Sequence, residues 1–119
     1  MDATPARAHQ PWLSHYKAHH IQVLFEAPML RILEATFAGG DQVPMHVHSH
    51  VVDHFWVLDG RLDIETVNPD QRIQLGAGGY FAIAAGRAHR VRNSSNTHCH
   101  FINLQGYGSY DFEPLEDAP

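Results

Sequence analysis

The chain has 119 residues, with 8 Lys and Arg against 13 Asp and Glu, and a formal net charge of −5 at pH 7. A chain of this length supports one hydrophobic core but not two independent ones. The acidic balance, together with the lack of any basic run, argues against a surface that binds nucleic-acid phosphates. Because Cys99 is the only cysteine, an intramolecular disulfide and a cysteine-rich zinc site are both excluded.

Residues 1–20 are predicted to form an N-terminal extension of the folded domain. They mix prolines, charges and histidines without a sustained hydrophobic period. The segment lacks the apolar region and cleavage-site pattern of a secretion signal, and no later apolar run approaches the length needed to cross a bilayer. We therefore expect a cytoplasmic protein that engages no membrane.

From Ile21 onward, short β-branched and aromatic runs alternate with turn residues. The second run, MLRILEATFA, also has apolar residues at helical spacing, so its composition leaves helix and strand open. The other runs are short and are bounded by Gly, Pro, Asn and Ser: IQVLFEA, RLDIETV, RIQL, YFAIA, HRVRN and HCHFINLQ. Many short strands without a convincing long helix predict an all-β sandwich or barrel over residues 21–113, followed by a polar tail at residues 114–119.

The segment from residue 40 to residue 60, GDQVPMHVHSHVVDHFWVLDG, carries three histidines at alternate positions. Alternate side chains of a strand share a face, so His46, His48 and His50 would lie together if the segment is extended. Imidazole is the commonest protein ligand for transition metals, and a metal site is therefore predicted. The alternative is a solvated histidine-rich loop, because 11 of the 119 residues are histidine.

Two motifs in this chain resemble those of the cupin superfamily. The family's first motif, G-x5-H-x-H-x(3,4)-E-x6-G, is matched by Gly40, His46, His48, Asp53 and Gly60. Its second motif, G-x5-P-x-G-x2-H-x3-N, is matched by Gly78, Gly86, His89 and Asn93. Asp53 stands where the family usually has Glu, and Ala84 where it usually has Pro. The resemblance implies the cupin double-stranded β-helix, a jelly-roll-like barrel.

The resemblance makes His46, His48 and His89 metal ligands and puts Asp53 at the carboxylate position. Asp is shorter than Glu by one methylene, roughly 1.5 Å of reach. Asp53 therefore either ligates directly after a shift of its strand or acts through water from just outside the ligand set. The implied cofactor is one divalent transition metal ion, with Fe(II) favoured and Mn, Ni, Zn and Cu as alternatives.

Polar and apolar side chains elsewhere are candidates for substrate binding and proton transfer. We predict Tyr80, Arg92 and His100 as catalytic residues, with Asn103 as a further polar anchor. Parity places His100 and Asn103 on opposite faces of one strand and leaves open which face is internal. An apolar wall of a small pocket is predicted from Phe37, Phe55, Val57, Phe81, Val91 and Phe101.

The run DHFWVLD has apolar side chains on both faces. Asp53, Phe55 and Val57 share one face, while Trp56 and Leu58 share the other with His54. A strand with one face toward water usually alternates apolar with polar residues. Either the N-terminal segment or a second subunit must therefore cover Trp56 and Leu58, and we predict a homodimer.

The function predicted from these features is that of a metal-dependent enzyme. The resemblance favours a non-haem oxygenase acting on a small oxygen-bearing organic substrate bound at the metal. Alternatives are a non-redox lyase or isomerase, and a non-enzymatic metal-binding or ligand-binding cupin. An open cavity at the ion would distinguish an enzyme from a closed structural site.

Overall fold

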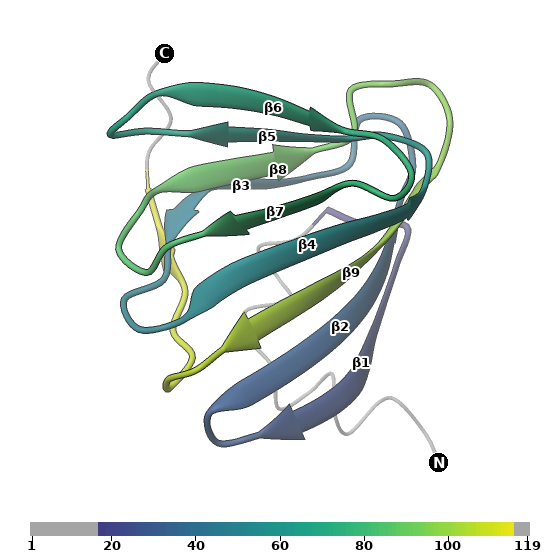
Figure 1. Ribbon diagram of the computed structural model, residues 1–119. Coiled ribbons are helices and arrows are strands. Elements are labelled where there is room, and N and C mark those ends of the chain that lie inside the picture. The colour runs from purple at the N-terminus through teal and green to yellow at the C-terminus, as the bar shows by residue number, and fades with distance from the viewer. Residues whose placement is uncertain (1–16, 116–119) are drawn as a thin grey trace.

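The computed structural model describes residues 17–115, and this part of the chain is folded entirely from strands and turns (Figure 1). The strands are β1 (His20–Ala27), β2 (Leu30–Phe37), β3 (Gln42–Val47), β4 (Val52–Asp59), β5 (Leu62–Thr66), β6 (Gln71–Leu75), β7 (Tyr80–Ile83), β8 (His89–Arg92), β9 (Cys99–Gly106) and β10 (Glu113–Pro114). Within residues 17–115, no helix is long and apolar enough to span a membrane. The all-β prediction is confirmed.

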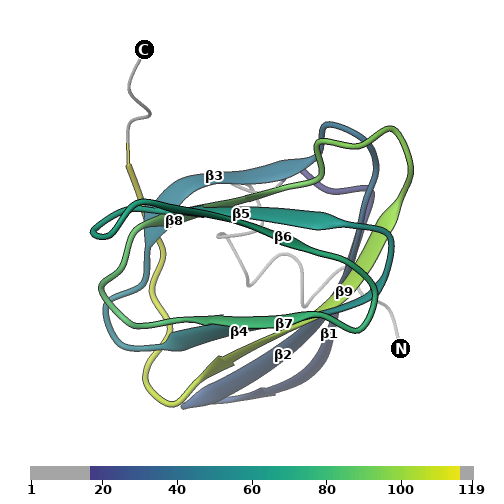
Figure 2. The same cartoon turned by 45° about the horizontal axis from the view of Figure 1, so that its top comes forward.

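The strands form two antiparallel five-stranded sheets, in the orders β1-β2-β9-β4-β7 and β10-β3-β8-β5-β6. The two sheets are opposite walls of one barrel (Figure 2). Seven of the nine connections between consecutive strands of this described chain pass from one sheet to the other, and only β1–β2 and β5–β6 stay within a sheet. These crossings define a double-stranded β-helix, as predicted.

Strand β2 is the run whose composition also suited a helix. Its buried residues are Arg31, Leu33, Ala35 and Phe37, which alternate with partly exposed ones along the whole strand. It pairs with β1 on one side and β9 on the other. The segment is therefore a strand and not a helix, because every second residue is buried.

The apolar core fills one end of the barrel interior. Its side chains come from both sheets and include Phe37, which meets Phe101 edge-on at 5.0 Å between ring centroids. Five residues of the predicted pocket wall are at most 3% exposed in this core: Phe37, Phe55, Val57, Val91 and Phe101. Phe81 packs against the same cluster. The prediction of an apolar pocket wall was wrong, because these side chains pack against one another.

Register brings polar residues together at the other end of the interior. Across β2, β9 and β4, Arg31 lies opposite Gln105, and Gln105 lies opposite Asp53. In the facing sheet, His46 lies opposite His89. Two residues further along β2 and β4, the buried residues that pair with Asn103 are the apolar Leu33 and Phe55. The interior is therefore divided along the strands into an apolar end and a polar end.

The motif glycines occupy turns that need a left-handed backbone. Gly60 has φ 80°, and a Cβ there would lie 2.3 Å from the carbonyl oxygen of His98. Gly86 has φ 81°, and its N–H donates to the carbonyl of His48 at 2.7 Å. Only glycine adopts such φ values without strain. The glycine spacing in the motifs thus follows from the turns beside the histidines.

The outer faces of the two sheets differ in character. On the sheet containing β5, β6 and β8, Glu65 forms ion pairs with Arg72, Arg90 and Arg92 at 3.5 to 3.8 Å. On the other sheet, Trp56 and Tyr80 lie in ring contact at 4.9 Å between centroids and are 38% and 46% exposed. The first face suits water, whereas the second exposes aromatic surface.

Candidate metal centre

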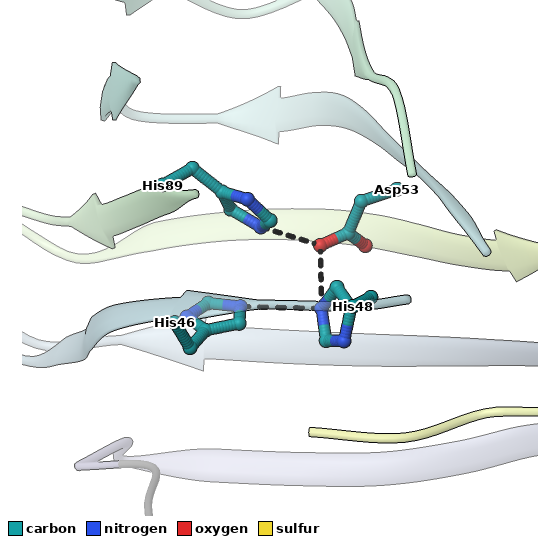
Figure 3. Close-up of side chains that lie close together, drawn as sticks. All are labelled: His46, His48, Asp53 and His89. Atoms are coloured by element: carbon teal, nitrogen blue, oxygen red, sulfur yellow. Dashed lines mark hydrogen bonds and ion pairs between the residues drawn. The ribbon is translucent and has the colours of Figure 1, made fainter. Parts of the chain in front are cut away.

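Four side chains converge at the polar end of the barrel (Figure 3). His46 lies on β3, His48 follows that strand directly, Asp53 lies on β4, and His89 begins β8. Each is at most 2% exposed. The Nε2 atoms of His46 and His48 are 3.2 Å apart, and Oδ2 of Asp53 lies 3.2 Å from His48 Nε2 and 2.9 Å from His89 Nε2. The sequence placed these residues in one site, and the structure brings them together.

The spacing of the four donor atoms fits one coordination sphere. All lie within 4.8 Å of one another. Two ligands at right angles around an ion, each bonded at about 2.1 Å, lie about 3.0 Å apart. Neighbouring donor atoms here are 2.9 to 3.2 Å apart. Three imidazoles and a carboxylate suit iron, manganese, nickel, zinc or copper.

The outer nitrogen of each imidazole is held by a backbone carbonyl. Nδ1 of His46 donates to Pro44 at 2.7 Å, Nδ1 of His48 to Asp111 at 2.6 Å, and Nδ1 of His89 to Arg87 at 2.9 Å. This arrangement assigns the ring proton to Nδ1 and directs Nε2 inward. Two facing Nε2 atoms at 3.2 Å require a cation or a proton between them. The site therefore fits a metal ion.

Charge in the cluster follows from burial and the pairing of Asp53 with histidine. Burial, reinforced by His89 and His48, lowers the pKa of His46 to about 3. Burial is the largest influence on the pKa of His48 and lowers it, but the hydrogen bond to Asp53, the charge of Asp53 and the contacts with Asp111 together outweigh burial and raise this pKa. Burial alone would raise the pKa of Asp53, yet the bonds from His48 and His89 hold it well below its usual range. Asp53 is thus an anion at neutral pH.

Two amides from β9 orient the carboxylate of Asp53. Its Oδ1 accepts hydrogen bonds from Asn103 Nδ2 at 2.7 Å and from Gln105 Nε2 at 3.2 Å. Its other oxygen, Oδ2, faces the histidines. Although Asp is shorter than Glu, β4 brings this carboxylate into the cluster itself, at the same spacing as the imidazoles.

Arg31 extends this chain of contacts away from the cluster. Its Nε and Nη2 both donate to Gln105 Oε1, at 3.0 and 2.7 Å. Its guanidinium lies over the ring of Tyr110, 3.4 Å from the centroid. Arg31 and Gln105 were not predicted from the sequence as parts of the site. The available signal was parity, because Gln105 shares a strand face with Asn103, and Arg31 shares one with Leu33.

The chain after β9 covers the cluster. The Phe112 ring stacks on His46 at 4.5 Å between centroids, and Tyr110 lies 5.2 Å from His48. The backbone N–H of Ser49 donates to Asp111 Oδ1 at 2.7 Å, and β10 pairs with β3. Residues 110–112 were not predicted to belong to the site, since no spacing rule connects them to the motifs.

The structure does not bring the three predicted catalytic residues to the cluster. Tyr80 accepts or donates a hydrogen bond at 2.6 Å with His54 Nδ1 on the outer face. Arg92 pairs with Glu65 at 3.5 Å, and His100 pairs with Glu34 at 3.2 Å. Parity explains the placement of Arg92 and His100, because the buried residues of β8 and β9 alternate with them. On β7, Tyr80 has the opposite parity to the buried Ile83. The assignment of these side chains to the site is corrected accordingly.

Of the predicted polar anchors, Asn103 lies at the cluster, where it donates to Asp53. His100, on the same strand, faces outward and pairs with Glu34. His50 and His98 are exposed and stand apart from the four buried side chains. The alternation of His46, His48 and His50 thus ends at His48. The chain turns after that residue, before β4 begins at Val52.

A double-stranded β-helix with three histidines and a carboxylate at one end of the barrel defines a class of β-barrel proteins whose side chains could hold a metal ion there. Residues 33–104, more than half of the chain, match the family described as Cupin domain. The chain therefore belongs to the cupin family. No curated protein matches its sequence significantly.

Solved structures share this fold at low sequence identity. An uncharacterized conserved protein with a double-stranded β-helix domain from Klebsiella pneumoniae has TM-score 0.72 and 22% identity, over 82% of this chain and 84% of that one. The polyketide cyclase RemF from Streptomyces resistomycificus has TM-score 0.73 and 16% identity, over 87% and 75%. A recombinant oxalate oxidase in complex with glycolate has TM-score 0.69 and 18% identity, over 80% of this chain but only 54% of that one.

Proposed function

We propose that this cupin is a metal-dependent enzyme acting on a small oxygen-bearing organic molecule, with Fe(II) as its metal and an oxygenase reaction as its chemistry. The main support for this proposal is the arrangement of the three imidazoles. Their Nδ1 atoms donate to backbone carbonyls, and their Nε2 atoms converge with Asp53 Oδ2. Four protein ligands leave positions for substrate on a six-coordinate ion.

In this proposal, His46, His48, His89 and Asp53 hold the ion, which when bound supplies Lewis acidity and redox chemistry toward oxygen. Asn103 and Gln105 keep Asp53 Oδ2 turned toward the histidines. Phe112 and Tyr110 exclude water from one side of the imidazoles. The oxalate oxidase and polyketide cyclase among similar structures show that this fold accompanies small-molecule chemistry in other proteins.

A second candidate function is non-enzymatic metal or ligand binding. The observation that favours it is that the four side chains are closed off from solvent. They are at most 2% exposed, and Phe112 stacks on His46. Non-redox lyase or isomerase chemistry is the enzymatic alternative, since the same ligands accept redox-inactive metals. The cytoplasmic location stays a prediction.

Elemental analysis of untagged protein, before and after anaerobic reconstitution with iron(II), tests the proposal. We expect iron near one per chain and substrate-dependent oxygen uptake with a panel of small diketones, thiols and hydroxy-acids. Zinc, nickel or manganese without oxygen uptake would favour lyase or isomerase chemistry. Stoichiometric metal with no turnover of any kind would favour the binding protein, and no metal under any condition would contradict both.

We also propose that a second copy of this chain covers the aromatic outer face of β4 and β7. That face exposes Trp56, Leu58 and Tyr80, whereas the outer face of the opposite sheet is a network of ion pairs. Aromatic side chains are enriched in interface centres, and charged ones are depleted there. The other predicted cover, residues 1–16, lies outside the described part of the chain.

The oligomeric state tests this homodimer. Light scattering coupled to size exclusion should give twice the mass of one chain for the wild type. Trp56→Glu should give a monomer, because a desolvated carboxylate at the interface centre has no partner. Arg72→Glu, on the ion-paired face, is the matched control and should remain dimeric. A monomeric wild type, or a dimer retained in Trp56→Glu, would refute this interface.

A further inference from the structure

A cavity of about 550 Å³ lies beside the metal centre. It is formed by the turn between β1 and β2, the end of β9 and the chain that follows β9. Its polar lining comes from Glu26, Arg31, Gln105, Ser109 and Tyr110. Gln105 belongs to both places, because it lines the cavity and donates to Asp53 Oδ1 at 3.2 Å. The volume is in the range of small-molecule sites, roughly 300 to 1,000 Å³.

The positively charged side chain in the lining of this cavity is Arg31, whose guanidinium is buried and fixed in orientation. Arg31 is 4% exposed, with the ring of Tyr110 against its guanidinium and Gln105 Oε1 accepting from Nε and Nη2. Guanidinium groups bind carboxylates through paired N–H donors, and a side chain that is already ordered loses little entropy on binding. Because Nε and Nη2 both donate to Gln105, an incoming carboxylate would bind this ordered guanidinium at its Nη1 end, beside Glu26.

One anion already beside Arg31 is Glu26, and the contact between them is long. Glu26 Oε2 lies 3.7 Å from Arg31 Nη1, beyond hydrogen-bond distance, and its side chain is 46% exposed against 5% for that of Arg31. Ion pairs with an exposed partner at such a distance contribute little. A carboxylate entering from solvent can take the place of Glu26 at the guanidinium, while Ala27, Pro28 and Leu30 offer apolar contacts to the rest of the molecule.

We propose that this cavity binds the carboxylate of a small organic acid through Arg31, and that this acid is the substrate of the neighbouring metal centre. The second part rests on the proposed function, whereas the anion site itself does not. Arg31 is connected to Asp53 by two hydrogen bonds through Gln105, so a carboxylate bound at Arg31 lies three contacts from Asp53. The substrate class is thereby narrowed from oxygen-bearing molecules in general to organic acids.

Benzoate and its uncharged analogue benzamide are the probes for the anion site. Titration of metal-free protein, followed by heteronuclear NMR, should show shifts at Gly108 and Ser109 with benzoate, and binding at least about tenfold weaker for benzamide. Arg31→Met should lose the preference for benzoate. Glu26→Gln removes the competing carboxylate from an exposed position and should tighten benzoate binding. Arg92→Met, an arginine on the outer face of the opposite sheet, is the control and should change nothing.

Equal affinity for benzoate and benzamide, or no binding of either, would overturn the anion site. Preference for benzoate retained in Arg31→Met would do the same, and if that variant does not fold, an unchanged benzoate affinity in Glu26→Gln decides against it. Repeating the titration with metal-loaded protein tests the second part, because linked sites change each other's affinity by the same factor. A protein that binds benzoate but no metal would refute the proposed function and leave the anion site standing.

Discussion

Replacing His48 or His89 by alanine should abolish stoichiometric metal binding and leave a folded barrel. Each imidazole supplies one of four converging donor atoms, and each lies within 3.2 Å of Asp53 Oδ2. With a ligand removed, the carboxylate and two remaining imidazoles hold an ion far less tightly. Elemental analysis after dialysis against a weak chelator measures the stoichiometry, and circular dichroism verifies the fold.

His100→Ala is the matched control for these two variants. His100 is a histidine on β9 that faces outward and pairs with Glu34 at 3.2 Å. Its replacement should leave the metal content unchanged. Full metal retention in both His48→Ala and His89→Ala would contradict the metal centre proposed here.

Replacing Asn103 by leucine should weaken metal binding without removing a ligand. Asn103 Nδ2 donates to Asp53 Oδ1 at 2.7 Å, and leucine keeps its approximate volume while deleting that donor. Loss of such an orienting partner typically reduces metal affinity by about 10- to 100-fold. Competition titration against a chromophoric chelator gives the dissociation constant. Asp53→Ala in the same assay shows how much the carboxylate itself contributes, and a smaller loss than in His48→Ala would place it outside the ligand set.

Asn93→Leu is the control that distinguishes loss of the orientation of Asp53 from a general loss of stability of the protein. Asn93 is equally buried, but its side-chain amide donates to the carbonyls of Phe37 and Thr97 and makes no bond to the cluster. Both leucine variants should lower the free energy of unfolding by about 1–3 kcal/mol, because each leaves buried polar groups without their partner. Only Asn103→Leu should change the metal affinity. Equal affinities in the two variants would show that Asn103 does not orient Asp53.

Local patterns predicted the all-β class, and the resemblance to the two cupin motifs implied the four converging residues. Turn residues between short β-branched runs predict strands wherever they occur, because those preferences act over a few residues. The two motifs combine such turns with histidines at fixed distances from them. Gly86, for example, makes the turn that bonds to the carbonyl of His48 and lies three residues before His89. The site could therefore be predicted from the resemblance of this spacing to the cupin motifs.

Which face of a strand points inward was decided only by the tertiary structure. Parity alone could not separate His100 from Asn103, and Tyr80, Arg92 and His100 were accordingly misplaced. The decision depends on burial against the opposite sheet, which is a property of the whole barrel. The same holds for the aromatic side chains expected to line a pocket, since they fill the core.

The surroundings of the metal centre depend on contacts between residues far apart in the chain. Arg31 bonds to Gln105, 74 positions later, and His48 bonds to the carbonyl of Asp111, 63 positions later. No local preference encodes such pairs; they arise from the order and register of strands in the sheet. The sequence by itself determined the strands, their turns and the donor set of this protein. The orientation of the carboxylate, the cover over the histidines and the cavity at Arg31 were decided by the tertiary structure, because each requires the register of strands that are distant in the chain.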